Sequence, residues 1–190
     1  MASGQSKTVT LILGGARSGK SRYAQELASP FEKVIFIATA RREDAEMRVK
    51  IARHRRERPA SWKTLEVSTG LDRALRGKCH GADLLIIDCL TIYVANAMGR
   101  KQGESRQLRS HMGSIREAIR ESAASVIIVS NEVGWGVVPP YRSGRKYRDL
   151  LGEINQQVAQ IADRVILMVA GLPMIVKDRV PRSKVAGRKK

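Results

Sequence analysis

Short apolar runs alternate with segments of helical periodicity along most of the chain. Runs with few polar positions are typical of strands that are buried on both faces. Such runs predict strands at Val9–Leu13, Val34–Ala38, Leu84–Asp88, Val126–Val129 and Arg164–Val169. Stretches with charged or helically spaced residues, several of them bounded by proline, predict helices at Ser21–Ala28, Glu43–Arg56, Gln107–Ser122 and Arg145–Ala162.

Weaker signals complete this pattern. Trp62–Val67 favours a short strand, and Gly171–Pro173 favours a turn into a last strand at Met174–Val176. The segment Gly99–Gly103 favours an exposed loop. Strands that alternate with helices are typical of a mostly parallel sheet with helices on both faces. We therefore expect an α/β fold in which Met174–Val176 is an antiparallel edge strand.

The chain has 190 residues, of which 43% are apolar, and this is enough for one substantial core. We expect a single domain over residues 8–177, preceded by a disordered leader at 1–7 and followed by a basic, flexible tail at 178–190. No apolar stretch approaches the ~20 residues that a membrane-spanning helix needs. The first residues also lack the apolar centre of a secretion signal. These features predict a cytoplasmic protein without membrane contact.

The net charge of +17 favours polyanionic partners, which include nucleotides, nucleic acid and acidic metabolites. Aromatic residues make up only 4% of the chain, and this leaves few platforms on which single-stranded nucleic acid could stack. Nucleic-acid binding is therefore the less favoured alternative. The cysteines Cys79 and Cys89 have neither zinc-site nor redox spacing, so we expect structural thiols.

A phosphate-binding loop follows the first predicted strand. The segment fits the pattern G-x-x-x-x-G-K-S between a strand and a helix, the context that this motif requires. Its residues are Gly14, Gly15, Ala16, Arg17, Ser18, Gly19, Lys20 and Ser21. The glycines let several backbone N–H groups face one anion, and Lys20 can neutralise the β- and γ-phosphates. Ser21 can bind Mg²⁺. The motif predicts a P-loop NTPase-like fold.

Acidic residues end two of the predicted strands. Asp88 stands where a carboxylate would hold Mg²⁺, directly or through water. The alternative is that Asp88 caps a helix that starts near Cys89. Glu132 follows the next central strand and is a candidate acid or metal-linked group. A polar latch between that strand and its loop is an equally good interpretation of Glu132.

His54 lies among arginines, on the helical face that Met47 and Ile51 also share. A cationic environment lowers the pKa of an imidazole, so a neutral nucleophilic nitrogen persists at neutral pH. Such a histidine can attack an α-phosphate and form a covalent nucleotidyl intermediate. An exposed basic helix with an incidental histidine is the alternative, and the residues alone favour it. His80 and His111 lack this setting, and we expect ordinary surface residues there.

These motifs together resemble one family, the bifunctional adenosylcobinamide kinases and adenosylcobinamide-phosphate guanylyltransferases of cobalamin biosynthesis. The similarity extends from about Thr8 to Lys177. Besides the phosphate-binding loop, it rests on a series of blocks in family order, namely Ile37–Thr39, His54 with Arg58–Trp62, Asp88–Thr91, Val129–Gly134, Val138–Asp149, Asn155-Gln156 and Val169–Gly171. Most of these blocks are absent from P-loop proteins in general, so the resemblance is specific.

The resemblance implies two reactions at one nucleotide site: phosphorylation of the cobinamide aminopropanol hydroxyl with ATP or GTP, then transfer of GMP from GTP through a GMP-histidine. It makes His54 the nucleophile and Lys20 the second catalytic residue. Besides the phosphate-binding loop, it implies nucleotide contacts at Thr39, Ala40, Arg41, Arg55, Arg56, Glu57, Arg58, Glu66 and Asp88. It also implies Mg²⁺ at Ser21 and Asp88, adenosylcobinamide as acceptor, and a homotrimer.

The chain departs from the family pattern at a few positions. Relatives can have adjacent histidines where this chain has Arg53-His54, and glutamate where it has Asp88. The pair Ser143-Gly144 makes one stretch richer in glycine than the family pattern. The competing interpretations are a plain P-loop small-molecule kinase, in which His54 is structural, and a basic nucleic-acid-binding ATPase.

Overall fold

The computed structural model describes residues 7–41, 58–98 and 104–179. The strands are β1 (Val9–Gly14), β2 (Val34–Ala38), β3 (Lys63–Glu66), β4 (Leu84–Asp88), β5 (Ser125–Val129), β6 (Arg164–Val169) and β7 (Leu172–Asp178). The helices are α1 (Lys20–Ala28), α3 (Leu71–Lys78), α4 (Leu90–Met98), α5 (Glu104–Glu121) and α6 (Arg142–Ile161). Within these described ranges, none of the helices is long and apolar enough to cross a bilayer.

The strands form one sheet in the order β3-β2-β4-β5-β1-β6-β7. The pairs from β3 to β6 are parallel, and β7 runs antiparallel to β6 at the edge. The expected α/β fold with a mostly parallel sheet and an antiparallel edge strand is therefore confirmed. The phosphate-binding strand β1 lies between β5 and β6, and β5 separates it from β4.

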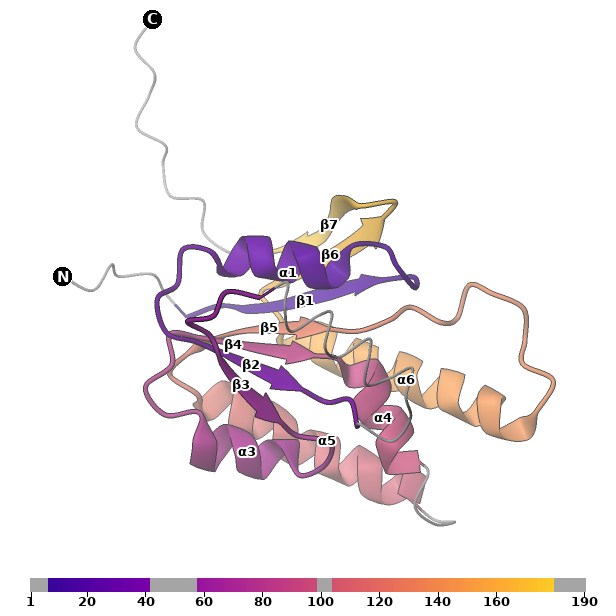
Figure 1. Ribbon diagram of the computed structural model, residues 1–190. Helices are drawn as coiled ribbons and strands as arrows, with labels where there is room; N and C mark the ends of the chain where they lie inside the picture. Colours follow the sequence, from indigo (N-terminus) through magenta and orange to yellow (C-terminus); the bar gives the residue numbers. More distant parts are fainter. Residues whose placement is uncertain (1–6, 42–57, 99–103, 180–190) are drawn as a thin grey trace, which may run out of the picture.

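Helices cover both faces of the sheet, as Figure 1 shows. Alternate residues of β1 face opposite sides, and Leu11 and Ile12 belong to different core clusters. On one face, Ala24 and Ala28 of α1 pack against the sheet. On the other face, the helices α3, α4, α5 and α6 bury their apolar sides. The strands are apolar throughout because both of their faces are covered.

The predicted strands are present, with small changes at their ends. The strand predicted at Trp62–Val67 is β3, and the one predicted at Met174–Val176 extends to Leu172–Asp178. The helices α5 and α6 begin about a turn before the predicted starts at Gln107 and Arg145. The helix predicted at 43–56 and the loop predicted at 99–103 lie outside the described residues.

Helix α3 was not predicted, and α4 was considered only as the helix that Asp88 would cap. Helix α4 follows β4 almost at once and begins with apolar residues, so the sequence has no polar break to separate strand from helix. Helix α3 is short, and Arg73, Arg76 and Gly77 weaken its apolar pattern to Leu71, Ala74 and Leu75. In both cases the buried positions become evident only from the elements against which the helix packs, because the stability of short helices depends mainly on tertiary packing.

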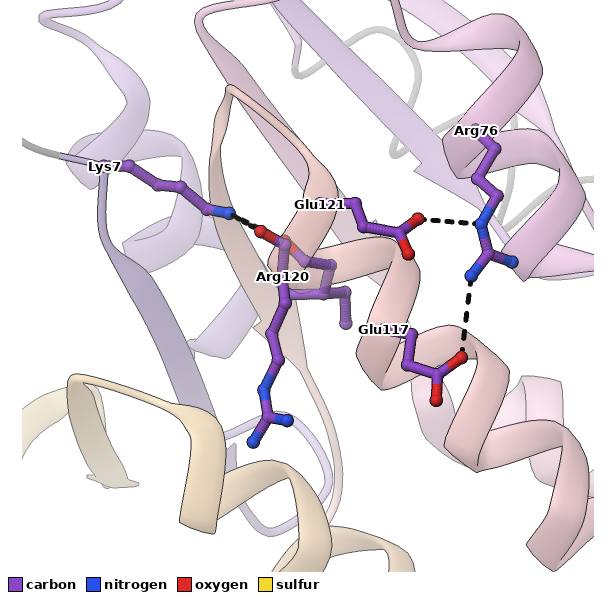
Figure 2. A network of polar contacts seen from close by, with 6 residues as sticks. Lys7, Arg76, Glu117, Arg120 and Glu121 are labelled. Atoms are coloured by element: carbon purple, nitrogen blue, oxygen red, sulfur yellow. Dashed lines mark hydrogen bonds and ion pairs between the residues drawn. The ribbon is translucent and has the colours of Figure 1, made fainter.

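Polar contacts fasten α3, α5 and the chain start to one another at the amino ends of the strands (Figure 2). Arg76 of α3 pairs with Glu121 of α5 at 2.9 Å and with Glu117 at 3.8 Å. Lys7 donates from Nζ to the main-chain oxygens of Ile119 and Arg120, at 3.0 and 2.6 Å. The last residue of the expected leader is thus tied to α5.

Ordered contacts also continue past residue 177, where we expected the tail to begin. Asp178 ends β7 and lies 3.4 Å from the Arg164 guanidinium, and the Arg179 N–H donates to the Asp163 carbonyl. The remaining residues of the expected leader, 1–6, and of the expected tail, 180–190, lie outside the described residues.

Candidate active site

The phosphate-binding loop connects the carboxyl end of β1 to α1. Open α/β sheets bind their ligands at the carboxyl ends of the strands, and β1 lies near the middle of this sheet. The first N–H groups of an α-helix lack partners within the helix. At the start of α1, the N-cap residue Gly19 supplies no side-chain hydrogen bond. These backbone donors, together with the positive end of the helix, are the features with which such loops bind phosphate.

Gly14 allows the loop to pass close to β6. A Cβ atom at this position would lie 2.6 Å from the Met168 carbonyl oxygen and 2.7 Å from Ser18 Oγ, and the backbone has φ of 151°. Further along, Arg17 and Gly19 have φ of 56° and 93°. The loop therefore curls through left-handed conformations, which brings successive N–H groups toward a common centre.

Lys20 lies folded over the loop. Its Nζ donates to the carbonyl oxygens of Gly14 at 2.9 Å and Gly15 at 2.6 Å, and it lies 3.4 Å from Ser18 Oγ. Burial lowers the pKa of Lys20, while the nearby Cys89 and Asp88 act in the opposite direction. The ammonium group is thus buried beside the loop, where phosphate oxygens would be stronger partners than carbonyls.

Thr39 joins the end of β2 to the end of β4. Its hydroxyl donates to the Cys89 carbonyl at 2.8 Å and accepts from the Cys89 N–H at 2.9 Å. Its N–H donates to Asp88 O, and its carbonyl accepts from Asn96 Nδ2 at 2.8 Å. The residue is fully buried. In this structure Thr39 fixes the backbone at Asp88 and Cys89.

Asp88 ends β4 and is half-buried. Among the described residues, no hydrogen bond to its carboxylate is present, and α4 begins only at Leu90. The helix-cap alternative for Asp88 therefore finds no support. Cys89, next to it, has its pKa raised to about 11, mainly by burial and then by the Asp88 charge. A half-buried, neutral thiol agrees with the expected structural role.

Ser21 and Asp88 fit a magnesium ion by their chemistry. Both offer oxygen ligands, which Mg²⁺ prefers. The described residues contain no cluster of three or more histidine, cysteine, aspartate or glutamate side chains that could hold a metal by themselves. Mg²⁺ in nucleotide sites is typically held by one or two protein oxygens, substrate phosphates and water, and this residue set matches that arrangement.

Glu132 lies where the loop after β5 meets the phosphate-binding loop. Its N–H donates to the Gly14 carbonyl at 3.1 Å, and its Oε1 accepts from the Gly134 N–H at 2.9 Å. These contacts match the latch interpretation of Glu132. The other carboxylate oxygen is not engaged in these contacts, so its role as an acid or metal-linked group stays a prediction.

The remaining predicted contacts lie on β2 and β3. Arg58 places its guanidinium carbon 3.4 Å from the centre of the Phe36 ring, a cation–π contact. Glu66 ends β3, four strand positions from β1, which corresponds to about 19 Å at ~4.8 Å per strand. Ala40 and Arg41 follow β2 and are half-buried. His54, Arg55, Arg56 and Glu57 lie outside the described residues.

Some positioning residues were not predicted. Thr91 in α4 accepts the Asn131 N–H at 2.7 Å, and Asn155 in α6 donates to the Asn131 carbonyl at 3.0 Å. Tyr147 donates to the Thr91 carbonyl at 3.1 Å. Together they fix the chain just before Glu132. The signal in the sequence was a polar residue on the apolar face of a predicted helix, as at Asn155 beside Ile154 and Val158.

His111 differs from its expected surface role. Its Nε2 lies 2.8 Å from Tyr93 Oη and 3.4 Å from Asp72 Oδ1, and its ring stacks on that of Tyr93. Because Tyr93 is buried and also accepts from the Leu71 N–H, this group links α3, α4 and α5. The prediction for His111 was wrong, since helix packing brings polar partners that the sequence does not place nearby. His80 is exposed, as expected.

A family model described as "Cobinamide kinase / cobinamide phosphate guanyltransferase" matches residues 10–176. The match includes nearly all of the sheet, the phosphate-binding loop and the contacts around Asp88 and Glu132. The chain belongs to this family. The family identifies an enzyme with cobinamide kinase and cobinamide phosphate guanylyltransferase activity. The resemblance and the function expected from the sequence are thereby confirmed.

Similar proteins support this assignment over nearly their full lengths. The bifunctional adenosylcobalamin biosynthesis protein CobP of Pseudomonas aeruginosa is 42% identical over 168 residues, covering 88% of this chain and 96% of that protein. CobU of Escherichia coli, which has the same description, is 35% identical over 178 residues, covering 88% and 98%.

A solved structure of an ATPase from the type III secretion system of pathogenic bacteria has a similar fold, with a TM-score of 0.57 at 14% identity. That match covers 91% of this chain and 58% of the ATPase. At this identity the match concerns the fold alone, and it confirms the P-loop NTPase-like class.

Proposed function

We propose that both reactions of this enzyme use one nucleotide site, built on the phosphate-binding loop and completed by His54. The observation that carries the proposal is the arrangement at the carboxyl edge of the sheet. There the loop from Gly14, the buried Lys20 and the carboxylate of Asp88 come together. The family resemblance implies a further nucleotide contact at Glu66, which ends β3 at the same edge.

In the kinase step, the cobinamide hydroxyl attacks the γ-phosphorus of ATP or GTP, the bond to the β-phosphate oxygen breaks, and the hydroxyl proton leaves. Lys20 and the backbone N–H groups of the loop stabilise the charge on the phosphates. Glu132, beside Gly14, is the candidate to accept the proton. Ser21, together with Asp88 directly or through water, would hold Mg²⁺, which would supply further charge neutralisation.

In the transfer step, a neutral His54 nitrogen attacks the α-phosphorus of GTP. A phosphorus–nitrogen bond forms, and pyrophosphate leaves as the phosphorus–oxygen bond breaks. A phosphate oxygen of cobinamide phosphate then attacks the same phosphorus, the phosphorus–nitrogen bond breaks, and His54 is restored. Arg55, Arg56 and Arg58 would stabilise the charge that builds on the phosphates.

We propose a homotrimer, as the family resemblance implies. An exposed apolar surface on the β6–β7 edge supports self-association. Large side chains that are at least half exposed there are Val169, Leu172, Met174, Ile175 and Val176. Surfaces of this kind commonly mark protein contacts. Light scattering of the purified protein measures its mass directly. A cytoplasmic location, where ATP and GTP are available, is part of the same proposal.

Separate variants distinguish the two steps. We expect Lys20→Met to lose both activities, because both need the phosphates in the loop. His54→Ala should keep the kinase activity and lose guanylyl transfer. His80→Ala is the matched control, because His80 is exposed and lies outside the proposed site. Kinase activity is measured as cobinamide phosphate formed from cobinamide, and transfer as cobinamide-GDP formed from cobinamide phosphate and GTP.

If His54→Ala still transfers GMP at the wild-type rate, His54 is not the nucleophile. If the wild-type protein phosphorylates cobinamide but never transfers GMP, this chain is the plain P-loop kinase that the sequence left open.

A further inference from the structure

The loop between β5 and α6 presents large apolar side chains to solvent. Trp135, Val137, Val138 and Tyr141 are 76%, 96%, 56% and 76% exposed. We call these four residues the platform. Side chains of this size are usually buried, and tyrosine and tryptophan are enriched at interfaces. The nucleotide chemistry described above uses none of them.

The platform loop is held in a defined shape. Arg145 Nη1 donates to the carbonyls of Pro139 and Pro140, at 3.0 and 2.6 Å. At the other end, the Gly134 N–H is bound by Glu132 Oε1. Gly144 lets Pro139 pack on α6, because a Cβ on Gly144 would lie 2.8 Å from Pro139 Cβ. Gly144 therefore has a structural role, and these contacts hold the backbone that carries the exposed side chains.

The loop that carries the platform begins beside the proposed nucleotide site. Its loop leaves β5, which lies between β1 and β4, the strands that carry the phosphate-binding loop and Asp88. The Glu132 N–H contacts the Gly14 carbonyl, so the root of the loop touches the phosphate cradle. Figure 1 shows the loop extending outward from this edge of the sheet before it returns to α6. The platform therefore begins three residues beyond the contact between Glu132 and Gly14.

The start of α6 adds positive charge beside the platform. Its first residues include Arg142, Arg145 and Lys146, all exposed, and no acidic residue lies in the first turn. The amino end of a helix favours anions further. The combined surface suits a ligand with a broad apolar face and an anionic end, rather than a uniformly apolar partner.

From these observations we infer that the platform binds the acceptor substrate, with a face of the corrinoid ring against Trp135 and Tyr141 and the acceptor hydroxyl or phosphate directed to the loop at Gly14. A corrinoid combines a broad ring with a polar rim, which aromatic side chains and cations can recognise together. This inference rests on the proposed function. It assigns the acceptor site, which no motif in the sequence indicates.

The experiment compares Trp135→Ala and Tyr141→Ala with wild type in the intact protein. His80→Ala is the control, because His80 is exposed and lies outside both the platform and the proposed subunit contact. Stacking on one aromatic side chain contributes enough that the KM for cobinamide should rise at least about fivefold in each platform variant. The KM for GTP should stay at the wild-type value, as should guanylylation of the protein by GTP without acceptor. Trp135→Phe, which keeps an aromatic ring, should restore most of the affinity.

Equal acceptor KM values in Trp135→Ala, Tyr141→Ala and wild type would overturn the inference. So would a loss of subunit association in light scattering with unchanged acceptor binding, because the platform would then be a subunit interface. Equilibrium dialysis with cobinamide, whose colour reports the bound fraction, needs no turnover. Weaker binding by the platform variants there supports the inference even if the protein failed to transfer GMP, so the two proposals fail separately.

Discussion

Replacing Gly14 with alanine would place a methyl group where the phosphate-binding loop meets β6. The new Cβ would lie 2.6 Å from the Met168 carbonyl oxygen and 2.7 Å from Ser18 Oγ, and 3.2 Å from Met168 Cβ. The first of these atoms is backbone, paired across the sheet from Gly14 itself, so it cannot move without disturbing the strands. The φ of 151° adds strain for any residue with a side chain.

The magnitude follows from these two causes. Inserting a methyl group into a packed site typically costs about 1–3 kcal/mol. A strained backbone conformation costs about 1–3 kcal/mol, and this cost is not fully additive with that of the steric clash. We therefore expect the free energy of unfolding to fall by roughly 2–4 kcal/mol, a large share of the ~5–15 kcal/mol of a typical domain. GTP affinity should fall as well, because the N–H groups of the loop would lose their common centre.

Gly15→Ala is the matched control, since it is the same change at the next position of the same loop. A Cβ there would meet no atom within 4 Å. Its effect on unfolding should stay within about 0.5 kcal/mol, as for most surface changes. Urea denaturation followed by circular dichroism gives both free energies, and calorimetry with Mg·GTP gives both affinities. Similar losses of stability in the two variants would refute the close approach at Gly14.

Further variants test the contacts around the site. In Thr39→Val, the Cys89 N–H loses its acceptor, which should lower the free energy of unfolding by about 1–3 kcal/mol in urea, whereas Thr39→Ser keeps the hydroxyl and loses less. For Lys20, whose pKa burial lowers, calorimetry across pH should show GTP affinity weakening at high pH as the ammonium deprotonates, while Lys20→Met binds weakly at every pH. The hydrogen bond from Arg109 lowers the pKa of Glu153, so its stabilisation is present above the ordinary carboxyl pKa and is lost as the pH falls through the lowered value. Glu153→Gln should therefore be slightly less stable than wild type at neutral pH and equally stable in strong acid. An unchanged difference at all pH values would contradict the ion pair.

The local pattern of apolar and polar residues was sufficient to predict most of the fold. The strands β2, β4 and β6 have their predicted bounds, because a strand covered on both faces is an uninterrupted apolar run. The order of the strands was not predictable, since it depends on which runs pair across the chain. That order places β5 between β1 and β4, and so decides that the Glu132 loop adjoins Gly14.

For the candidate site too, the local residues could be predicted and the long-range contacts could not. The phosphate-binding loop is local, so its motif located Gly14 and Lys20. Asp88 was predicted because it ends a strand, but the hydrogen bonds between Thr39 and Cys89 join residues 50 positions apart and could not be predicted from the local pattern. The exposure of Trp135 likewise depends on the course of its loop away from the sheet, and this course could not be predicted from the sequence.

The most direct test of the account follows GMP through one turnover. The enzyme is incubated with Mg²⁺ and GTP labelled at the α-phosphate, freed of nucleotide, and then given cobinamide phosphate. We predict label on the protein at His54 that is stable in base and labile in acid, and its complete transfer to the corrinoid product. Label that reaches the product without ever being bound to the protein, or that His54→Ala binds and transfers equally well, would contradict a shared nucleotide site completed by His54.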